Sequence, residues 1–372
     1  MSKLEQLITE LCPDGVKYQL IKELAEVGTG RSNGNEAQEN GCFPFFIRSQ
    51  TVKSKNEWEF DEEAIIIPGE GGIGEIYHYI SGRYAIHQRV YRIHFTDNNI
   101  DAKFAFYYFR AYFKSFIIKR AVSATVKSIR KPMIEDFKIP LPPLPVQAEI
   151  VRILDNFTEL TAELTAELTA RKKQYEYYKN ELFGEAEGVQ TVTLDMISEN
   201  CDSQRKPVTS GSRENGDIPY YGASGIVDYV KDYIFDGDYL LISEDGANLI
   251  ARTTPIAFSI SGKTWVNNHA HVLRFDEYAT RRYVEMYLNS IDLTPYITGA
   301  AQPKLNQGNL NSIKIPIPSL PEQQRIVGIL DRFDTLCNDI SSGLPAEIEA
   351  RQKQYEYYRD KLLTFPKVEL EV

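Results

Sequence analysis

The stretch IPLPPLPVQAEIVRILDNF at residues 139–157 occurs a second time, with few changes, as IPIPSLPEQQRIVGILDRF at residues 315–333. Farther along, RKKQYEYYKNEL at residues 171–182 returns as RQKQYEYYRDKL at residues 351–362. The first pair begins at residues 139 and 315, an offset close to half of the 372-residue chain. A duplication of this size predicts two similar halves related by an approximate two-fold axis.

Each copy opens with a proline-rich hinge, Pro140–Pro145 and Pro316–Pro321. Proline pushes the preceding residue towards extended geometry, so a domain should end at the hinge and a helix should begin just beyond it. After the first hinge, apolar residues recur at spacings near three and four from residue 147 to residue 183. This narrow stripe predicts a helix of about 55 Å with the seam of a coiled coil.

The second copy of this helix is interrupted by SSGLP at residues 341–345, where Gly ends one helix and Pro begins the next. The first copy is four residues shorter there and reads TELTAELTAELTA at residues 158–170. If the halves are related by a two-fold axis, the second helix returns towards the first domain. We therefore expect two antiparallel helices that hold two domains at opposite ends.

The domains themselves are predicted to be α+β, because strands and helices do not alternate with the regularity of a doubly wound sheet. Runs of β-branched and aromatic residues predict strands at residues 64–67, 84–95, 239–243 and 264–275, and helices are expected at residues 103–120 and 280–289. The expected domains are residues 1–140 and 186–316, followed respectively by helices at residues 141–185 and 317–372.

Polar residues differ between the two copies while the apolar frame persists. GCFPFFIRSQTV at residues 41–52 aligns with GDIPYYGASGIV at residues 216–227, and SGRYAIHQRVYRIHF at residues 81–95 aligns with SGKTWVNNHAHVLRF at residues 261–275. Two copies of one scaffold with different polar faces indicate two recognition modules for two different ligands. Neutral drift of a solvated surface is the alternative interpretation.

The content of hydrophobic residues (42%) and charged residues (25%) indicates a globular protein. We expect a cytoplasmic location. No apolar run approaches the roughly 20 residues that cross a membrane, and the first residues, MSKLEQLITEL, do not form a secretory signal. The four cysteines lack metal-ligand spacing. The net charge of −10 argues against a simple basic DNA-binding domain, but residues 103–138 hold nine basic residues against two acidic ones. Such a local patch can still bind phosphates.

The chain resembles the specificity (S) subunit of type I restriction–modification systems. The likeness covers both variable domains, the proline hinges with their LPxQxxIVxILD-like helix starts, the RxKQYEYY helix ends and the TAEL tetrapeptides at residues 161–168. The resemblance implies a non-catalytic subunit without a cofactor, whose two target recognition domains bind a bipartite asymmetric site in double-stranded DNA. It also implies that the helices dock two methyltransferase subunits, which methylate adenine N6 with S-adenosylmethionine, and that endonuclease/translocase subunits join that core.

Several strings imitate catalytic motifs. GEGGIG at residues 69–74 matches a dinucleotide fingerprint, but we expect residues 75–80 to continue as a strand, where a pyrophosphate site needs a helix N-terminus. GKT at residues 262–264 lacks the first Gly of a P-loop, and no N/D-P-P-Y/F string of an adenine methyltransferase occurs. A fused enzyme is thus disfavoured, whereas a non-catalytic coiled-coil scaffold with protein-binding heads stays open as an alternative.

The candidate DNA contacts are polar residues in the variable segments, some of which have a solvated or purely structural role as the alternative. Basic side chains beside small residues suit phosphate and groove contacts. The set comprises Arg48, Ser49, Gln50, His87, Gln88, Arg89, Lys127, Arg130 and Lys131 in the first copy, and Asn267, Asn268, His269, Gln302, Lys304 and Asn306 in the second.

Tyrosines mark the repeated end of the long helix. Three tyrosines within four positions cannot all face one helix–helix seam, so at least one should point to another surface. By default these residues are helix-pair core, but we also consider them for a methyltransferase-subunit interface. They are Tyr175, Tyr177 and Tyr178, with the copies Tyr355, Tyr357 and Tyr358.

Overall fold

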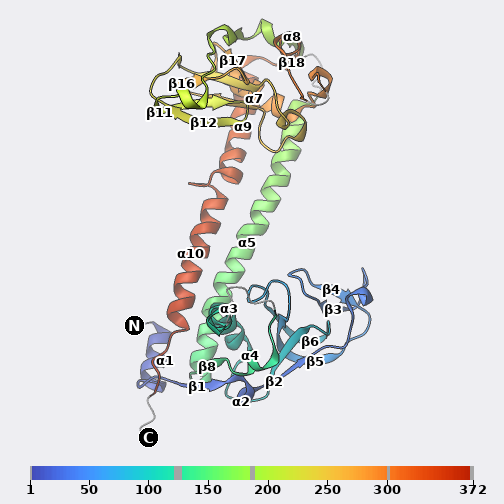
Figure 1. Cartoon of the computed structure of the whole chain (residues 1–372), viewed down its shortest axis with the longest axis vertical. Helices are drawn as coiled ribbons and strands as arrows, with labels where there is room; N and C mark the ends of the chain where they lie inside the picture. Colours follow the sequence, from blue (N-terminus) through green and yellow to red (C-terminus); the bar gives the residue numbers. More distant parts are fainter. Residues whose placement is uncertain (1, 121–127, 185–188, 300–301, 369–372) are drawn as a thin grey trace. The chain divides into compact units, whose positions relative to one another are not determined.

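The computed structural model describes residues 2–120, 128–184, 189–299 and 302–368 (Figure 1). Its contacts form two compact units, one of residues Met1–Thr165 with Glu347–Val372 and the other of residues Ala166–Ala346. Each unit contains one domain with both strands and helices and a part of the long helices. The α+β class expected from the sequence is confirmed.

The domain of the first unit is built around a six-stranded sheet in the order β2-β7-β5-β6-β3-β4, in which only β3 and β6 are parallel neighbours. The helix α3 (Ala102–Arg120) packs against this sheet (Figure 1). The strands are β2 (Ala25–Thr29), β3 (Phe43–Phe46), β4 (Lys53–Lys55), β5 (Phe60–Pro68), β6 (His78–Ile86) and β7 (Val90–Phe95).

The central strand β5 is buried on both faces. Ile65 packs into the core that contains Phe109 of α3, whereas Ile66 joins a smaller cluster with Tyr84. Successive side chains of a strand point to opposite faces, so an unbroken apolar run is typical of a strand covered on both sides. The predicted strand at residues 64–67 is confirmed as part of β5.

The domain of the second unit contains two four-stranded sheets, in the orders β12-β11-β16-β13 and β10-β17-β14-β15. Their strands are β10 (Glu199–Asn200), β11 (Asn215–Gly222), β12 (Gly225–Val230), β13 (Phe235–Asp236), β14 (Tyr239–Ser243), β15 (Ala257–Ile260), β16 (Lys263–Val266) and β17 (Ala270–Arg274). The helix α7 (Tyr278–Ser290) packs on β14 and β15. The predicted strand at residues 239–243 and the helix at residues 280–289 are confirmed.

Short elements complete both domains. Each hinge carries a strand that pairs antiparallel with the start of its own domain: β1 (Lys17–Leu20) with β8 (Lys138–Leu141), and β9 (Gln190–Thr193) with β18 (Lys314–Ile317). The short α-helices are α1 (Lys3–Leu11), α2 (Ile21–Leu24), α4 (Lys131–Glu135), α6 (Asn248–Ala251) and α8 (Gln307–Asn311). The 3-10 helices are Gly34–Glu36, Leu194–Met196, Asp202–Gln204, Ser210–Ser212 and Thr294–Tyr296.

Two predicted strands are wrong in detail, because each is a pair of strands joined by a tight turn. Residues 84–95 divide into the end of β6 and β7, and residues 264–275 divide into β16 and β17. In the first turn His87 Nδ1 accepts a hydrogen bond from the backbone N–H of Arg89 (3.0 Å), and in the second Asn267 Oδ1 accepts from the N–H of His269 (2.8 Å). Such local bonds compete with the strand ladder.

The expected strand at residues 75–80 is also wrong over its first half. Gly71, Gly72 and Gly74 all have positive φ, and the N–H of Glu75 donates to the carbonyl of Gly72 (3.0 Å), so the chain turns before β6 begins at His78. The rejection of a dinucleotide site stands on the same geometry, since no helix follows this glycine-rich loop.

The repeated LPxQ string begins the long helices by burying its glutamine. In α5 (Leu144–Phe183), Gln147 Nε2 donates to the carbonyl of Pro142 (2.7 Å) and its Oε1 accepts from the backbone N–H of Asp101 (2.8 Å). In α9 (Leu320–Asn338), Gln323 Nε2 donates to the carbonyl of Pro318 (2.8 Å). Each glutamine thereby satisfies the backbone of the hinge that precedes its helix.

The break in the second helix is confirmed: α9 ends at Asn338 and α10 (Leu344–Leu362) begins after it. A Cβ added at Gly343 would lie 2.5 Å from the carbonyl oxygen of Thr335, so this position requires glycine. None of the described helices has the length and apolar character needed to cross a membrane.

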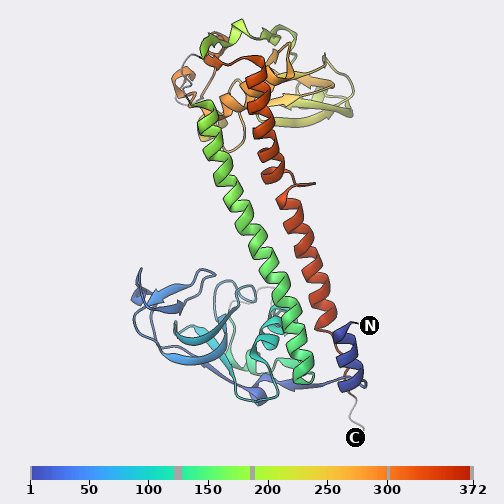
Figure 2. The ribbon, with the colours of Figure 1, turned by 180° about the vertical axis from the view of Figure 1, so that it is seen from behind.

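Within each unit, α5 pairs with a different helix. In the first unit α5 lies beside α10 (Figure 2). Phe157 of α5 contacts the rings of Tyr355 and Tyr358 in α10, with centroids 6.5 and 5.6 Å apart. In the second unit Phe333 of α9 contacts Tyr175 and Tyr178 of α5, at 6.2 and 5.7 Å. The duplicated sequence therefore produces the same aromatic contact twice, with the roles of the helices exchanged.

The aspartate of the repeated ILD string ties each domain to its long helix. Asp155 of α5 accepts hydrogen bonds from Lys103 Nζ and Tyr107 Oη of α3, both at 2.6 Å. Its counterpart Asp331 in α9 accepts from Nε of Arg282 in α7 at 2.8 Å. The helices α3 and α7 are thus fixed to the long helices by a charged contact as well as by packing.

Candidate nucleic-acid interface

Four loop segments of the first domain meet at one place. The turn between β3 and β4 contacts the start of β6, because the carbonyl of Ser49 lies 3.2 Å from His78 Nε2. The loop after β5 contacts the β6–β7 turn, since the N–H of Gly69 donates to the carbonyl of Arg89 (2.9 Å). The segment before α4 joins them through the N–H of Ile129, which donates to the carbonyl of Gly69 (2.8 Å).

The structure brings two of the predicted arginines together. Arg48 Nη1 and Arg89 Nη1 both donate to Glu70 Oε2, at 3.1 and 2.9 Å. All three side chains are partly exposed. The hydrogen bond from Arg89, supported by the charge of Arg48, holds the pKa of the Glu70 carboxyl below its ordinary value. Two cations are therefore presented to solvent on a shared, ionised carboxylate.

The neighbouring candidates have mixed roles. Ser49 Oγ accepts from the backbone N–H of Thr51 (3.1 Å), while Gln50 is exposed. Gln88 is exposed as well, and its Nε2 donates to Asn33 Oδ1 (2.9 Å). His87 is buried, and burial lowers its pKa, so a neutral imidazole accepts the turn hydrogen bond described above. For His87 the structure therefore favours the structural alternative over a DNA contact.

Of the predicted basic loop, Lys127 lies outside the described residues. Arg130 stands immediately before α4 and is exposed, and its guanidinium makes no ion pair with any described residue. Lys131 lies 3.5 Å from Glu135 Oε1, one helical turn away. Arg130 is thus the more accessible of the two cations.

In the second domain the corresponding four loop segments meet in the same way but carry different side chains; we call this arrangement of four segments the frame. The N–H of Glu244 donates to the carbonyl of His269 (2.9 Å), and the N–H of Leu305 donates to the carbonyl of Glu244 (2.8 Å). The β11–β12 turn is fixed by Ser243 Oγ, which donates to the carbonyl of Ala223 (2.5 Å). The same four segments therefore meet in both domains.

The charges on this second frame differ from those of the first. His269 Nδ1 lies 2.9 Å from Asp245 Oδ2, in the place of the pair formed by Arg89 and Glu70. Lys304 Nζ lies 3.1 Å from Glu244 Oε1. The first domain thus presents two guanidinium groups, whereas the second presents an imidazole and an ammonium group.

The remaining candidates of the second domain divide into exposed and structural residues. Asn268 and Gln302 are exposed. Asn267 is buried and accepts the turn hydrogen bond, as His87 does in the first copy. Asn306 is the N-cap of α8, where its Oδ1 accepts from the N–H of Asn309 (2.9 Å). For Asn267 and Asn306 the local geometry accounts for the side chain without DNA.

Beneath this face lies a cluster whose residue types could hold a metal ion: Asp202, Glu244 and His271. Cations of the protein already occupy the carboxylates, since Arg205 Nη1 lies 2.6 Å from Glu244 Oε2 and Lys304 reaches Glu244 from the other side. His271 Nδ1 lies 2.6 Å from Asp202 Oδ2. We therefore interpret the cluster as an ionic network of the core and not as a metal site.

This network anchors the loop that carries Lys304. His271 Nε2 lies 2.7 Å from the carbonyl of Leu305, and the carboxylate of Asp202 also accepts from the backbone N–H of Val272 (2.8 Å). Burial alone would raise the pKa of the Asp202 carboxyl, but the hydrogen bond from His271 and the other contacts hold it below its ordinary value. The loop therefore rests on a buried, ionised carboxylate.

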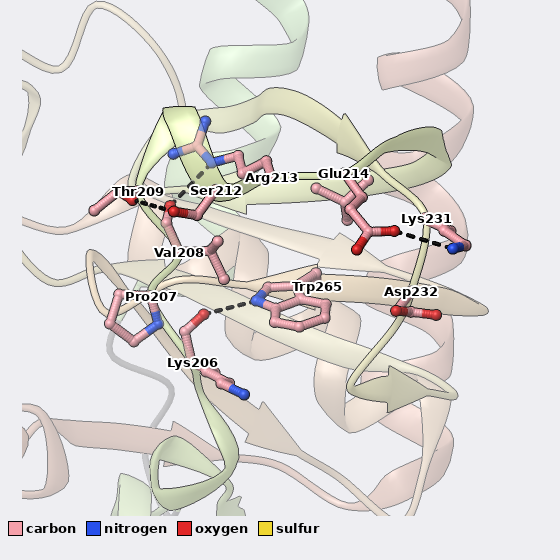
Figure 3. A pocket seen from close by; sticks show the side chains of 11 residues that line it. Lys206, Pro207, Val208, Thr209, Ser212, Arg213, Glu214, Lys231, Asp232 and Trp265 are labelled. Atoms are coloured by element: carbon pink, nitrogen blue, oxygen red, sulfur yellow. Dashed lines mark hydrogen bonds and ion pairs between the residues drawn. The ribbon is translucent and has the colours of Figure 1, made fainter.

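A hollow of about 460 Å³ lies beside the β11–β12 hairpin (Figure 3). Trp265 lies in it and donates through Nε1 to the carbonyl of Lys206 (2.6 Å). Lys231 and Glu214, which both line the hollow, are paired at 3.0 Å. A smaller hollow of about 400 Å³ lies at the corresponding hairpin of the first domain, at residues 37–39 and 52–54. Because Lys231 and Arg213 of its lining are already paired with carboxylates, the larger hollow is not an evident anion site.

The exposed tyrosines form the same pair in both copies. Tyr177 and Tyr357 are 60% and 63% exposed, and each packs edge-on against its neighbour, Tyr178 or Tyr358, with centroids 5.6 and 5.3 Å apart. Tyr175 and Tyr355 are instead half-buried in the helix pairs. The expectation that one tyrosine of each trio points away from the seam is confirmed.

Sequence analysis missed the acidic members of these sites. Glu70 follows β5, in the string that imitates a glycine motif. Glu244 and Asp245 follow β14, in a segment that the sequence analysis did not single out. A carboxylate in the aligned position of both copies, in GEGG and EDGA, was the available signal. Its basic partners lie about 20 residues away in sequence, so the pairing becomes visible only in the fold.

Comparison with known proteins identifies the family. The model of the type I restriction modification DNA specificity domain matches residues 13–171 and again residues 186–350. A type I restriction enzyme specificity subunit from Escherichia coli is 40% identical over 263 residues, which cover 62% of this chain and 64% of the relative. A putative specificity subunit from Haemophilus influenzae is 39% identical over 183 residues, covering 48% of this chain and 47% of the relative.

The chain thus matches about half to two thirds of the length of these two relatives. A shorter putative type I specificity subunit from Mycoplasma pneumoniae is 30% identical over 246 residues and is covered to 97% of its length.

Solved structures share the fold at low sequence identity. The type I restriction-modification S subunit from M. genitalium superposes with a TM-score of 0.65 at 17% identity, covering 94% of this chain and 96% of that one. A chain from a structural study of complex assembly in the type I R-M system gives 0.58 at 13% identity, covering 95% and 98%. With both halves matched by the family model and the fold shared along the chain, this protein belongs to the type I restriction modification DNA specificity domain family, of which it carries two copies.

Proposed function

We propose that this chain is the DNA sequence-specificity subunit of a type I restriction–modification complex. The observation that carries the proposal is a pair of family domains with one shared frame and two different sets of charges. One frame holds Arg48 and Arg89 on Glu70, and the other holds His269 on Asp245. Such a pair suits a bipartite asymmetric target in double-stranded DNA, with one half-site for each domain.

The division of the chain follows from this assignment. The first target recognition domain comprises residues 1–140 and the second comprises residues 186–316, while residues 141–185 and 317–372 form the helical parts between and after them. Within the domains, the exposed candidates Gln50, Gln88, Asn268 and Gln302 supply groove contacts, together with the charged groups of the two frames.

Arg130 is proposed as a phosphate contact of the first domain. It is exposed and unpaired among the described residues, and it stands at the N-terminal end of a short helix beside Lys131. Phosphate contacts from such cations position a protein on the duplex without reading its sequence. We assign Lys127 to the same role from its place in the sequence.

The partners follow from the exposed aromatic pairs on the long helices. Aromatic residues are enriched at protein–protein interfaces, and Tyr177 with Tyr178 recurs as Tyr357 with Tyr358 in the second copy. We assign each pair to one of two methyltransferase subunits. Adenine N6 methylation and ATP-dependent DNA cleavage would then reside on the methyltransferase and endonuclease/translocase subunits, in the cytoplasm, and this chain would itself be non-catalytic.

The alternative is a coiled-coil scaffold whose two domains bind proteins and not DNA. Since we propose that the domains bind DNA as part of a complex, a gel-shift assay of the chain assembled with the methyltransferase subunit distinguishes the two alternatives. Our proposal requires retention of a duplex that carries the target found by methylation mapping, at concentrations that leave a scrambled duplex unbound. Equal retention of both duplexes, or of neither, would favour the scaffold.

A further inference from the structure

We propose that Glu70 and Asp245 are the specificity-determining positioning residues of the two domains, each holding the basic side chain that reads a base in its own half-site. The inference rests on the proposed function and assigns one base-contacting side chain to each half-site. Under it, Arg89 reads a guanine in the first half-site and His269 reads a base in the second.

Both carboxylates occupy the same point of the repeated frame. Each follows directly on the residue that is held by two backbone hydrogen bonds, Gly69 in the first domain and Glu244 in the second. In both domains that residue donates its N–H to the carbonyl of the basic residue, Arg89 or His269, at 2.9 Å. The acid and the base are therefore brought together by backbone geometry that survived the divergence of the two copies.

The geometry favours a base over a phosphate as the ligand of Arg89. Its Nη1 is occupied by Glu70, whereas Nη2 and Nε make no hydrogen bond with any described residue. A guanidinium edge with two parallel donors matches O6 and N7 of guanine. A phosphate at that edge would bring its charge close to the Glu70 carboxylate, while the neutral base edge carries no such penalty. Arg130, which has no acidic partner among the described residues, is the contrasting phosphate contact.

The same carboxylate also limits how Arg89 can move. Glu70 Oε2 accepts from Arg48 as well as from Arg89, so the two arginines are held on one acceptor. Fixing a long side chain before binding reduces the rotamer freedom that would be lost on contact with DNA. Removing the carboxylate should therefore reduce discrimination between bases more than it reduces binding.

In the second domain the side chain proposed to contact a base is the imidazole of His269. Asp245 engages Nδ1 of His269 at 2.9 Å, and this leaves Nε2 as the atom that can meet a base edge. The neutral ring offers an acceptor there, which suits an exocyclic amino group, and the protonated ring offers a donor.

Several charged groups lie close to His269. Asp245 and Glu244 lie on the adjoining loop, Lys304 is held on Glu244, and Arg205 reaches both Glu244 and the carbonyl of Ala270. These acidic groups are therefore paired with basic groups of the same domain.

The test is methylation mapping in cells that express the full chain with its methyltransferase subunits. Glu70→Gln should reduce the preference for guanine at one position of the first half-site by roughly tenfold, as expected when a bidentate contact is weakened. The second half-site should stay unchanged in the same molecules, which excludes misfolding as the cause. Asp61→Asn is the matched control, because Asp61 also pairs with an exposed arginine of this sheet, Arg83, at 3.0 Å.

Asp245→Asn should relax one position of the second half-site alone, with Glu199→Gln as its control, since Glu199 pairs with the exposed Arg274 at 2.8 Å. Unchanged preferences in both variants, relaxation in the wrong half-site, or no guanine at the position read by Arg89 would overturn the inference. A wild-type complex that methylates no defined sequence would instead overturn the proposed function.

Discussion

At the level of single residues, the two copies meet the same local requirement with different side chains. The side chains of His87 and Asn267 each accept a hydrogen bond from the backbone N–H two residues later. This bond closes the turn that holds the basic residue, Arg89 or His269. Polarity alone made them candidates for DNA contact, and burial is what separates them from exposed Gln88 and Asn268. The sequence shows which residues are polar, but it does not show which of them stabilise the turn and which are exposed and free to contact DNA.

Gln147 gives the first residue-scale prediction. Its side chain is fully buried and hydrogen-bonds the backbone of Pro142, Asn99 and Asp101. Gln147→Leu should lower the free energy of unfolding by about 2–4 kcal/mol, because buried backbone groups lose their partners. Chemical denaturation measures the change. Gln190→Leu, at an exposed site, is the control, and an equal effect in both variants would refute the role of Gln147.

The buried network gives a prediction about pH. The folded state holds the pKa of the Asp202 carboxyl below its ordinary value, so its stabilising contribution is complete above about pH 4 and is lost as pH falls further. Asp202→Asn should cost roughly 3 kcal/mol at pH 7, as expected for a broken buried charge pair. It should also reduce the fall in Tm between pH 5 and pH 3 seen by calorimetry. A fall as steep as that of the native chain would contradict the assignment.

Arg130 provides the prediction for electrostatics. Arg130→Ala should weaken DNA binding of the assembled complex and reduce the slope of log K against log salt by about one unit, without altering base preference. Titrations at several salt concentrations give the slope. Lys131→Ala, which removes a cation already close to Glu135, should have the smaller effect, and the reverse order would argue against our assignment.

At the level of elements, periodicity predicted the helices better than it predicted the strands. The long helix begins at Leu144 and ends at Phe183, as the apolar stripe and the hinge indicate, and the break before Leu344 follows from SSGLP. The sequence predicts continuous strands at residues 84–95 and 264–275, because apolar residues lie on both sides of a turn that side-chain hydrogen bonds close. Pairing of strands distant in sequence, such as β3 beside β6, leaves no local trace.

The tetrapeptide of the central helix leads to a prediction at this scale. Four residues lengthen an α-helix by about 6 Å and turn it only about 40° beyond one full turn. Inserting one TAEL unit within residues 158–170 of α5 should therefore preserve the helix face. We expect both half-sites to remain and the unspecified spacer between them to lengthen by one to two base pairs, at about 3.4 Å each. Methylation mapping of the insertion variant decides it, and an active variant with an unchanged spacer would contradict it.

At the level of the whole molecule, the duplication explains why one chain would read two half-sites. Family matches at residues 13–171 and 186–350 agree with the repeat seen in the sequence. The parts that are alike in the two copies include the buried Gln147 and Gln323 at the starts of the long helices. They also include Asp155 and Asp331, which bond each long helix to its domain. The parts that differ are the charged frames. The sequence could locate the variable segments, whereas the bases they read depend on groove geometry that side-chain identity alone does not determine.

A domain exchange tests the central claim most directly. Residues 31–134 are replaced by the corresponding segment of a relative with a different target, and the methylated sequence is mapped in cells that hold the methyltransferase subunits. Our account predicts that one half of the bipartite site changes to that of the relative while the other half and the spacer stay the same. A change in both halves, or a fully active complex with the original site, would contradict the assignment of one half-site to each domain.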